Sequence, residues 1–584
     1  MQEDSNTPVL EVSNLGVSFQ SGGKTVQAVD DISFCLHHNE VLGIVGESGS
    51  GKSVTSLAIM QLLPKPAALI DQGKIMFYDG SANVDILAQS QRQMELIRGN
   101  RISMIFQEPM TSLNPVMRCG EQVAETLRKH KHLNNREAKE KTLQLFEEVR
   151  LPDPKRAWEA YPHQLSGGQK QRVMIASAIS CDPAVLIADE PTTALDVTVQ
   201  RSITDLLNRL REKYNMGIIF ITHDLGVIAD IAHQVVVMYK GRIVEKGTAA
   251  GIFSAPTHPY TQGLIACRPP IDFRYMKLPV VSDFLNKTEN ENSGIQTVFS
   301  QTNIEKPEER KQRHTEIYAA KPILEVKDLS VTYPDAGGLF KKKSVQHAVN
   351  DISFDVYYGE TLGLVGESGC GKTTTGRAIL RLIETSSGLI RYKDKELTKL
   401  SGSEIKHLRK NLQIIFQDPY SSLNPRQTVG SCLTEPMKVH GIGKNNAARK
   451  EIACDLLSQT GLLPEHFNRY PHEFSGGQRQ RICVARALSL QPEFIICDES
   501  VSALDVSVQA QVLNLLNDLK RNYGFTYIFI SHDLSVVRFM ADRIIVMNKG
   551  KIEETGDPDL VFQKPESPYT QKLIDSLPGK KVIG

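Results

Sequence analysis

Short apolar segments alternate with amphipathic ones along most of this chain. The segments "EVLGIVG", "AVLIADE" and "IIFITHD" are brief and mostly apolar, which is typical of strands that are buried on both faces. "SVTSLAIMQLL", which follows the first of them and ends at Pro64, has the spacing of an amphipathic helix. The alternation continues through the second half, so it predicts α/β domains with largely parallel sheets.

The same segments return in the same order in the second half. "GESGSGKS" (46–53) returns as "GESGCGKT" (366–373), "IFQEPMTSLNP" (105–115) as "IFQDPYSSLNP" (415–425), and "YPHQLSGGQKQR" (161–172) as "YPHEFSGGQRQR" (470–481). The offsets are 320, 310 and 309 residues. A period this long indicates a duplicated domain, not a solenoid repeat. The fall from 320 to 310 predicts an extra surface loop between Pro64 and Asn100 of the first copy.

A polar stretch separates the two copies. Residues 268–321 are rich in Asn, Gln, Glu and Lys and show little periodicity. We therefore predict a first domain over 1–267, a flexible polar linker over 268–321 and a second domain over 322–584.

Composition and charge exclude several classes of protein. The chain has 584 residues, which is too long for a single hydrophobic core, so several domains are expected. Its 68 Lys and Arg residues nearly balance its 67 Asp and Glu residues, and the net charge is +1. No basic footprint for nucleic acid stands out, and no apolar run approaches the roughly 18 residues that span a bilayer. The start "MQEDSNTPVL" is polar and unlike a secretory leader. We expect a cytoplasmic protein without a nucleic-acid partner.

The nine cysteines are scattered, and none is paired at C-x-x-C spacing. We expect reduced thiols and no iron–sulfur cluster.

The repeated glycine-rich segment lies between a predicted strand and a predicted helix, as a phosphate-binding loop requires. Its glycines let backbone N–H groups turn toward a polyphosphate, and the helix N-terminus favours negative charge. Lys52 and Lys372 would reach the outer phosphates, while Ser53 and Thr373 would hold Mg²⁺.

Paired carboxylates end the buried strands "AVLIADE" and "FIICDE". Charge is costly in such a place unless a metal or a water needs it. Asp189 and Asp498 would bind Mg²⁺, and Glu190 and Glu499 would orient the attacking water. Other polar residues stand where a phosphate, metal or water could be contacted: Gln107, Gln417, His223 and His532.

This ordered set resembles the ATP-binding-cassette ATPases over nearly the whole chain outside the linker. The resemblance implies two tandem P-loop NTPase domains, each with a RecA-like α/β core, an antiparallel β subdomain and a helical signature subdomain. It also implies that Ser-Gly-Gly-Gln of each copy completes the ATP site of the opposite domain, with Mg²⁺ as cofactor.

By this resemblance, each ATP site draws on both domains. The first site would contain Phe19 for adenine stacking, Ser48, Gly49, Ser50, Gly51, Lys52, Ser53 and Val54, with Gln107, Asp189, Glu190, His223, and Ser475, Gly477 and Gln478 of the other copy. The second would contain Tyr333, Ser368, Gly369, Cys370, Gly371, Lys372, Thr373 and Thr374, with Gln417, Asp498, Glu499, His532, and Ser166, Gly168 and Gln169. Both glutamates are present, so both sites are expected to hydrolyse ATP.

Two further motifs resemble the di- and oligopeptide importer branch. "QEPMTSLNP" and "QDPYSSLNP" look like the surface that receives a permease, and "HPYTQGLIA" and "SPYTQKLID" look like that branch's C-terminal element. Two such domains in one chain are similar to ATPases of glutathione and related peptide importers. Many of that group carry a cysteine cluster for an iron–sulfur centre, which neither half has.

The resemblance implies an energy-coupling ATPase at the cytoplasmic face of the inner membrane. Its partners would be two transmembrane permease subunits, fed by a periplasmic or lipid-anchored solute-binding protein. Alternatives are a different solute such as nickel, an opine or an antimicrobial peptide, a soluble twin-cassette translation factor, or a DNA-repair ATPase. The balanced linker and the absence of zinc-ligand spacing weigh against the last two.

Overall fold

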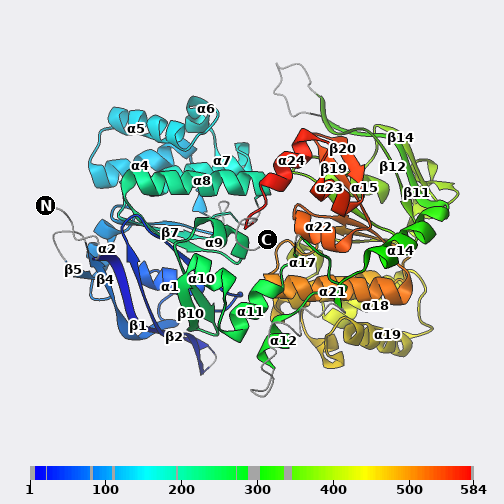
Figure 1. Cartoon of the computed structure of the whole chain (residues 1–584), viewed down its shortest axis with the longest axis horizontal. Coiled ribbons are helices and arrows are strands. Elements are labelled where there is room, and N and C mark those ends of the chain that lie inside the picture. The colour runs from blue at the N-terminus through cyan, green and yellow to red at the C-terminus, as the bar shows by residue number, and fades with distance from the viewer. Residues whose placement is uncertain are drawn as a thin grey trace. The chain divides into compact units, whose positions relative to one another are not determined.

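The computed structural model describes residues 7–21, 23–78, 83–107, 112–192, 195–270, 272–286, 303–334 and 345–579. The chain divides into two compact units, one of 1–265, 284–287 and 578–584, the other of 266–283 and 288–577. Each contains an antiparallel sheet, a mostly parallel sheet and a group of helices (Figure 1). The predicted α/β class and the duplication are confirmed.

The antiparallel sheet of the first unit has the strand order β2-β1-β4-β5. Val9, Leu10, Val12, Leu15 and Val17 of its central strand are buried, because one face of this sheet covers the core. The strands are β1 (Pro8–Ser21), β2 (Lys24–His37), β4 (Ala68–Tyr78) and β5 (Asn83–Asp85).

The second sheet of the first unit has the order β10-β9-β3-β8-β7-β6 and is parallel except for β10. Every residue of β3, β7 and β8 is buried, which explains their unbroken apolar sequences. The strands are β3 (Val41–Val45), β6 (Ile102–Ile105), β7 (Val185–Asp189), β8 (Gly217–Ile221), β9 (Gln234–Tyr239) and β10 (Arg242–Thr248). The helices α1 (Lys52–Ile59), α8 (Val197–Tyr214) and α9 (Leu225–Ile231) accompany them.

A separate group of helices completes the first unit (Figure 1). It consists of α4 (Cys119–Lys131), α5 (Asn135–Glu148), α6 (Pro154–Glu159) and α7 (Gly167–Ile179). Trp158, the only tryptophan, is buried there against Gly120, where a side chain would collide with the indole ring.

The second unit repeats this plan with sheets β12-β11-β14-β15 and β16-β17-β18-β13-β19-β20. Its strands are β11 (Pro322–Pro334), β12 (Val345–Tyr357), β13 (Thr361–Val365), β14 (Ser387–Tyr392), β15 (Lys395–Glu396), β16 (Leu412–Ile415), β17 (Phe494–Asp498), β18 (Thr526–Ile530), β19 (Arg543–Asn548) and β20 (Lys551–Gly556). Its matching helices are α15 (Lys372–Ile379), α18 (Val429–Val439), α19 (Asn446–Gln459), α20 (Gly476–Leu488), α21 (Val506–Tyr523) and α22 (Leu534–Met540).

The extra residues of the first copy are not simply a loop. β4 pairs with β1 as far as Ala68 opposite Phe19, whereas β14 pairs with β11 only as far as Ser387 opposite Ser330. Part of the insertion therefore lengthens a strand, because added residues beside an existing strand can satisfy their backbone hydrogen bonds there. Residues 79–82 lie outside the described part.

Much of the predicted linker has a defined course within the second unit. Pro307–Ala319 form helix α14, in which Arg310 lies 3.0 Å from Asp557 and Arg313 lies 2.8 Å from Asp542. Leu278 and the Asn514 side chain exchange two hydrogen bonds of 2.8 Å. The expectation of a flexible stretch misses these contacts, because charge balance and low periodicity do not reveal a partner surface. Residues 271 and 287–302 lie outside the described part, and the domain borders stay a prediction.

Candidate functional site

The glycine-rich loop of the first unit joins β3 to α1. Gly51 has φ of 102°, and a Cβ there would come within 2.7 Å of the Ala28 carbonyl oxygen, so the turn requires glycine. Lys52 donates from Nζ to the carbonyl oxygens of Gly46 (2.8 Å) and Glu47 (2.9 Å). The ammonium group is thus held inside the curve of the loop.

The loop of the second unit has the same geometry. Gly371 has φ of 109°, and Lys372 donates to Gly366 (2.7 Å) and Glu367 (2.9 Å). Cys370 replaces Ser50, is buried, and lies with Sγ 3.7 Å from Lys372 Nζ. The replacement therefore leaves the backbone cradle intact.

A buried aspartate meets the first helical turn in both units. Ser53 Oγ donates to Asp189 Oδ1 at 3.2 Å, and Thr373 Oγ1 donates to Asp498 Oδ1 at 2.8 Å. Burial raises the pKa of Asp189 to about 6, and it also raises the pKa of Asp498. A bound cation would stabilise the ionised carboxylates and so offset the cost of burying their charge.

Glu190 follows β7 directly and has a left-handed backbone with φ of 49°. Its N–H donates to the Ile221 carbonyl at 2.8 Å, which holds this conformation despite a cost of roughly 1–3 kcal/mol. Gln107 Nε2 donates to Glu190 Oε2 at 2.9 Å, and His223 Nδ1 lies 3.3 Å from Glu190 Oε1. Three residues predicted from separate motifs therefore meet at one carboxylate.

Glu499 repeats this arrangement with φ of 47°. Gln417 Nε2 donates to Glu499 Oε2 at 2.8 Å, and His532 Nδ1 lies 3.5 Å from the same oxygen. Although burial opposes both charges, the hydrogen bond between them lowers the pKa of Glu499 and raises the pKa of His532. The pair favours an ionised carboxylate beside a protonated ring.

These residues suit a magnesium polyphosphate. The hydroxyl of Ser53, the carboxylate of Asp189 and the amide oxygen of Gln107 are hard oxygen donors of the kind that Mg²⁺ prefers. Within the described residues, the buried Ser50 hydroxyl has no hydrogen-bond partner. A phosphate oxygen in the loop would supply one, so the chemistry of the first loop fits the predicted ligand.

The Ser-Gly-Gly-Gln segments begin helices α7 and α20. Ser166 Oγ accepts from Gln169 N at 3.3 Å, while the Gln169 side chain accepts from Ser166 N at 3.0 Å, and Ser475 and Gln478 form the same capping box. A Cβ on Gly168 would come within 2.9 Å of Val199 Cγ1 of α8. The motif therefore has a local structural role, whatever it contributes to another domain.

The two predicted adenine-stacking residues differ in exposure. Phe19 on β1 is half-buried and packs against the core of the first unit, whereas Tyr333 on β11 is 44% exposed. Val54 and Thr374 are half-buried in the first turns of α1 and α15. Tyr333 therefore leaves more of its ring accessible to a base than Phe19 does.

A contact that sequence reasoning missed joins the C-terminal elements to the glycine-rich loops. Tyr260 of α11 (Pro259–Ala266) is fully buried, and its hydroxyl accepts from Glu47 N at 3.0 Å. Tyr569 of α24 (Pro568–Asp575) accepts from Glu367 N at 3.2 Å. The tyrosine in "HPYTQ" and "SPYTQ" is the only hint in the sequence, and its partner lies about 200 residues away.

Comparison with known proteins shows which family the chain belongs to. The family described as "ABC transporter" matches residues 29–193 and 349–502. The chain belongs to the ABC transporter family. The description "Oligopeptide/dipeptide transporter, C-terminal region" matches residues 244–294 and 554–581, which include Tyr260 and Tyr569.

The curated relatives of this ABC protein cover nearly its whole length. It is 48% identical over 98% of its length to "Glutathione import ATP-binding protein GsiA" of Pectobacterium atrosepticum, and 49% identical to the protein so named in Salmonella typhimurium. The Escherichia coli protein of that name is 48% identical, and each match covers 89% of the relative. This ABC protein is therefore an ATPase, with hydrolysis coupled to transport.

Within the described part of the chain, no helix has both the length and the apolar character needed to cross a bilayer.

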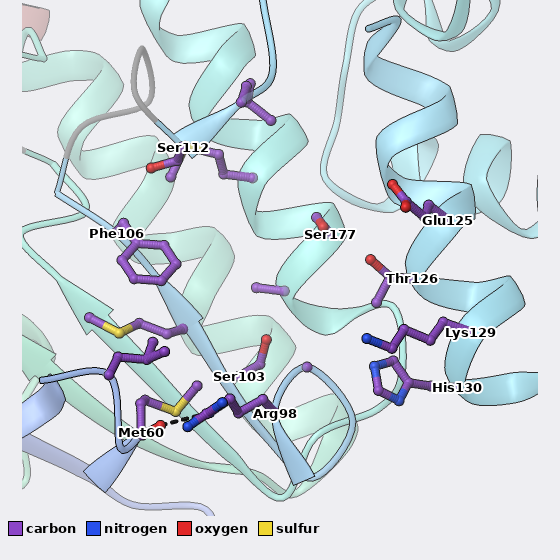
Figure 2. A pocket seen from close by; sticks show the side chains of 16 residues that line it. Met60, Arg98, Ser103, Phe106, Ser112, Glu125, Thr126, Lys129, His130 and Ser177 are labelled. Atoms are coloured by element: carbon purple, nitrogen blue, oxygen red, sulfur yellow. Dashed lines mark hydrogen bonds between the residues drawn. The ribbon is translucent and has the colours of Figure 1, made fainter. Parts of the chain in front are cut away.

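A groove lined by Phe106, the residue before Gln107, lies in the first unit and has a volume of about 460 Å³. In Figure 2, Phe106 and Ser112 lie on one side of it, while Glu125, Thr126, Lys129 and His130 project from α4 on the other. Arg98 donates to the carbonyl oxygens of Met60 (2.7 Å) and Gln61 (2.9 Å) at its base. Residues 108–111 of the predicted permease surface lie outside the described residues.

Proposed function

We propose that this chain is the ATP-hydrolysing subunit of an importer for glutathione or short peptides. The observation that carries the proposal is the identity of 48–49% with glutathione-import ATP-binding proteins across 98% of the chain. The match of residues 244–294 and 554–581 to the C-terminal region of oligopeptide and dipeptide transporters agrees with it. The proposed location is the cytoplasmic face of the inner membrane, as a peripheral subunit.

Each hydrolytic site would work through the contacts described above. Bound Mg²⁺ would polarise the outer phosphates of ATP. Lys52 and the loop amides would hold the phosphates, and Glu190 would orient the attacking water, with His223 and Gln107 fixing the carboxylate. Glu499, His532 and Gln417 would do the same in the second unit.

We propose further that the two units close head to tail around two ATP molecules. Ser475, Gly477 and Gln478 would complete the first site, and Ser166, Gly168 and Gln169 the second. The support is that both segments begin exposed helix N-termini, where backbone N–H groups favour a phosphate.

The groove beside Gln107 would receive a cytoplasmic segment of a permease subunit. Its position suits coupling, because Gln107 contacts Glu190, the proposed catalytic residue, and the preceding residue, Phe106, lines the groove. Closure driven by ATP would then move the permease between inward-facing and outward-facing states. A periplasmic or lipid-anchored binding protein would deliver the solute, whose identity the other subunits would decide.

Purification tests this function. The tagged chain, expressed at native level and extracted gently in detergent, should retain two multi-span permease subunits in mass spectrometry. In the reconstituted complex with its binding protein, glutathione or a short peptide should stimulate ATPase activity. Stimulation only by nickel or an opine would overturn the solute assignment, and ribosomal or DNA-repair partners without a permease would overturn the transport role.

A further inference from the structure

The chain passes from one unit to the other directly after each of the two C-terminal helices. α11 ends at Ala266, and residues 266–270 belong to the second unit. α24 ends at Asp575, and Pro578 and Gly579 belong to the first unit. Residues 267–270 and 576–579, which we call the first and the second connector, occupy equivalent positions 309 residues apart. Each unit therefore receives the segment that follows the C-terminal helix of the other.

Both connectors reach the helix that follows the histidine of the site. The N–H of Gly579 donates to Asp230 Oδ2 of α9 at 2.9 Å. At the equivalent position of the first connector, the Pro270 carbonyl oxygen lies 3.5 Å from Arg538 Nη1 of α22. Equivalent segments thus contact equivalent helices, although different groups make the contacts.

Buried arginines strengthen the contact in the second unit. Arg274, four residues beyond the connector, donates from Nη1 to the carbonyl oxygen of Ala541 at the C-terminal end of α22, at 2.8 Å. Arg538 Nε donates to Asp559 Oδ1 at 2.7 Å, and Arg274 lies 3.8 Å from the same oxygen. The side chains of Arg274 and Arg538 are 9% and 7% exposed. Since a buried donor that loses its partner is costly, this segment and α22 are held together.

The two contacted helices are short and packed closely on a strand. Each begins two residues after the histidine of its site. A Cβ on Gly363 of β13 would come within 2.3 Å of Val537 Cγ1 of α22, and a Cβ on Gly43 of β3 within 2.9 Å of Ile228 Cγ2 of α9. Such close packing leaves little room for one end of the helix to shift without the other. A contact at the C-terminal part of the helix therefore affects the histidine before its start.

The other end of each connector leads back to a phosphate loop. The hydroxyls of Tyr260 in α11 and Tyr569 in α24 each accept from a backbone amide of the loop in their own unit. The first connector contains Pro269 and Pro270, and the second contains Pro578. Proline fixes φ and so stiffens a short segment. One helix and a stiff connector therefore join the phosphate loop of one unit to the histidine helix of the other.

We propose that the connectors transmit nucleotide binding from the phosphate loop of each unit to the histidine helix of the other. Nucleotide in the first loop holds Tyr260, and the first connector then fixes α22 behind His532. The second connector acts in the same way on α9 and His223. Arg274 and Arg538 are positioning residues for His532, and Asp230 is one for His223. By linkage, the order imposed on a histidine helix also favours nucleotide in the distant loop.

Hydrogen exchange in chains with one working loop tests the proposal. Lys372→Ala leaves the first loop to bind MgADP, and slowed exchange of residues 46–54 shows that it is bound. ADP is used because the proposed closure requires ATP. We expect exchange of residues 534–541 in the second unit to slow about fivefold or more. In Lys52→Ala, MgADP in the second loop should slow exchange of residues 225–232 to a similar extent.

Insertions in the connectors test the route. Gly-Gly-Ser inserted after Arg268 lengthens the first connector and removes no side chain. In Lys372→Ala it should abolish the slowing in α22 and leave the slowing in the first loop. The same insertion after Leu577 tests the second connector and α9. An insertion after Gly441, in an exposed loop between α18 and α19, is the control.

Each outcome decides for or against the connectors. Unchanged exchange in α22 with ADP bound to the first loop would overturn the inference, and so would slowing that survives the insertions. Slowing that only the connector insertions abolish would support it. If an insertion prevents ADP binding, Pro269→Gly with Pro270→Gly loosens the first connector and gives the same test. The measurement needs neither permease nor solute, so a negative result leaves the proposed function standing.

Discussion

At the residue scale, the two neighbouring carboxylates at the end of β7 have different environments. Asp189 completes buried β7 and meets Ser53, whereas Glu190 turns away through a left-handed backbone toward Gln107 and His223. A continued strand would send the two side chains to opposite faces of the sheet, whereas the positive φ turns Glu190 at the strand end toward Gln107 and His223. The same conformation at Glu499 supports a shared chemical role.

Exchange of the two glutamates proposed to orient water should abolish most hydrolysis. Glu190→Gln and Glu499→Gln keep the side-chain shape but remove the charge, so each should lower turnover strongly, and the double variant by about 10²–10⁴-fold. Phosphate release measures this. The exposed Glu147→Gln of α5 is the control. Near-normal activity in one single variant would mean that its site does not contribute to turnover.

The buried tyrosines should matter for nucleotide affinity. Tyr260→Phe or Tyr569→Phe removes the acceptor of a loop amide, which costs about 0.5–1.5 kcal/mol. We expect KM for ATP to rise about 2–10-fold with a smaller effect on kcat, because the loop is held less firmly. Tyr214→Phe, which removes a hydroxyl that bonds Glu148, is the control. Equal KM values in variant and control would contradict the positioning role.

At the element scale, α14 is attached by residues that belong to the second unit alone. Asp542, Asp557 and Asp559 bind its arginines, and the first unit has His233, Thr248 and Ala250 at the equivalent positions. Asp542 is buried and also lies 2.7 Å from Lys520. The two units therefore differ at the positions where α14 docks on the second unit.

Removal of the Asp542 charge should destabilise this attachment. Although burial opposes its charge, Lys520, His314 and Arg313 hold the pKa of Asp542 well below its usual value. The ionised Asp542 therefore contributes its full stabilisation when the pH is above about 3.9, the pKa of an aspartate in the unfolded chain. This stabilisation is lost as the pH falls from there toward the lower pKa of the folded protein. At pH 7, Asp542→Asn should lower the free energy of unfolding of this unit by about 3–5 kcal/mol.

Hydrogen exchange in β19 and α14 measures this effect. Trp158 fluorescence reports the first unit and should not change, and the exposed Asp394→Asn serves as control. The difference between Asp542→Asn and wild type should shrink as pH falls below 4. A difference that is unchanged at low pH would show that charge is not the cause.

At the scale of the whole molecule, the duplication gives one chain two phosphate-binding loops and two Ser-Gly-Gly-Gln segments. In the double variant Glu190→Gln, Glu499→Gln, ATP with Mg²⁺ should therefore trap the proposed closed state, since hydrolysis no longer reopens it. Small-angle scattering should show a smaller radius of gyration with ATP than with ADP. Lys52→Ala with Lys372→Ala should abolish the change, and equal radii with both nucleotides would contradict head-to-tail closure.

Several parts of the site could be predicted from sequence because each is local. Lys52 is placed by its own loop, and Glu190 by the strand before it. Their position at a buried strand end, after a phosphate loop, assigns Asp189 to the metal and Glu190 to the water, and the structure places them beside Ser53 and Gln107. The roles themselves stay predictions until activity is measured.

By itself, the sequence determined the duplication, the α/β class, the phosphate loops and the membership of the ABC family. These follow from short motifs and periodicity, whose physical causes act over a few residues or one turn. Only the tertiary structure decided that Tyr260 reaches the loop, that α14 docks on acidic residues, and that Arg486 donates to the Ser422 carbonyl. Each joins residues far apart in sequence, and no local pattern specifies which distant surface a side chain will meet.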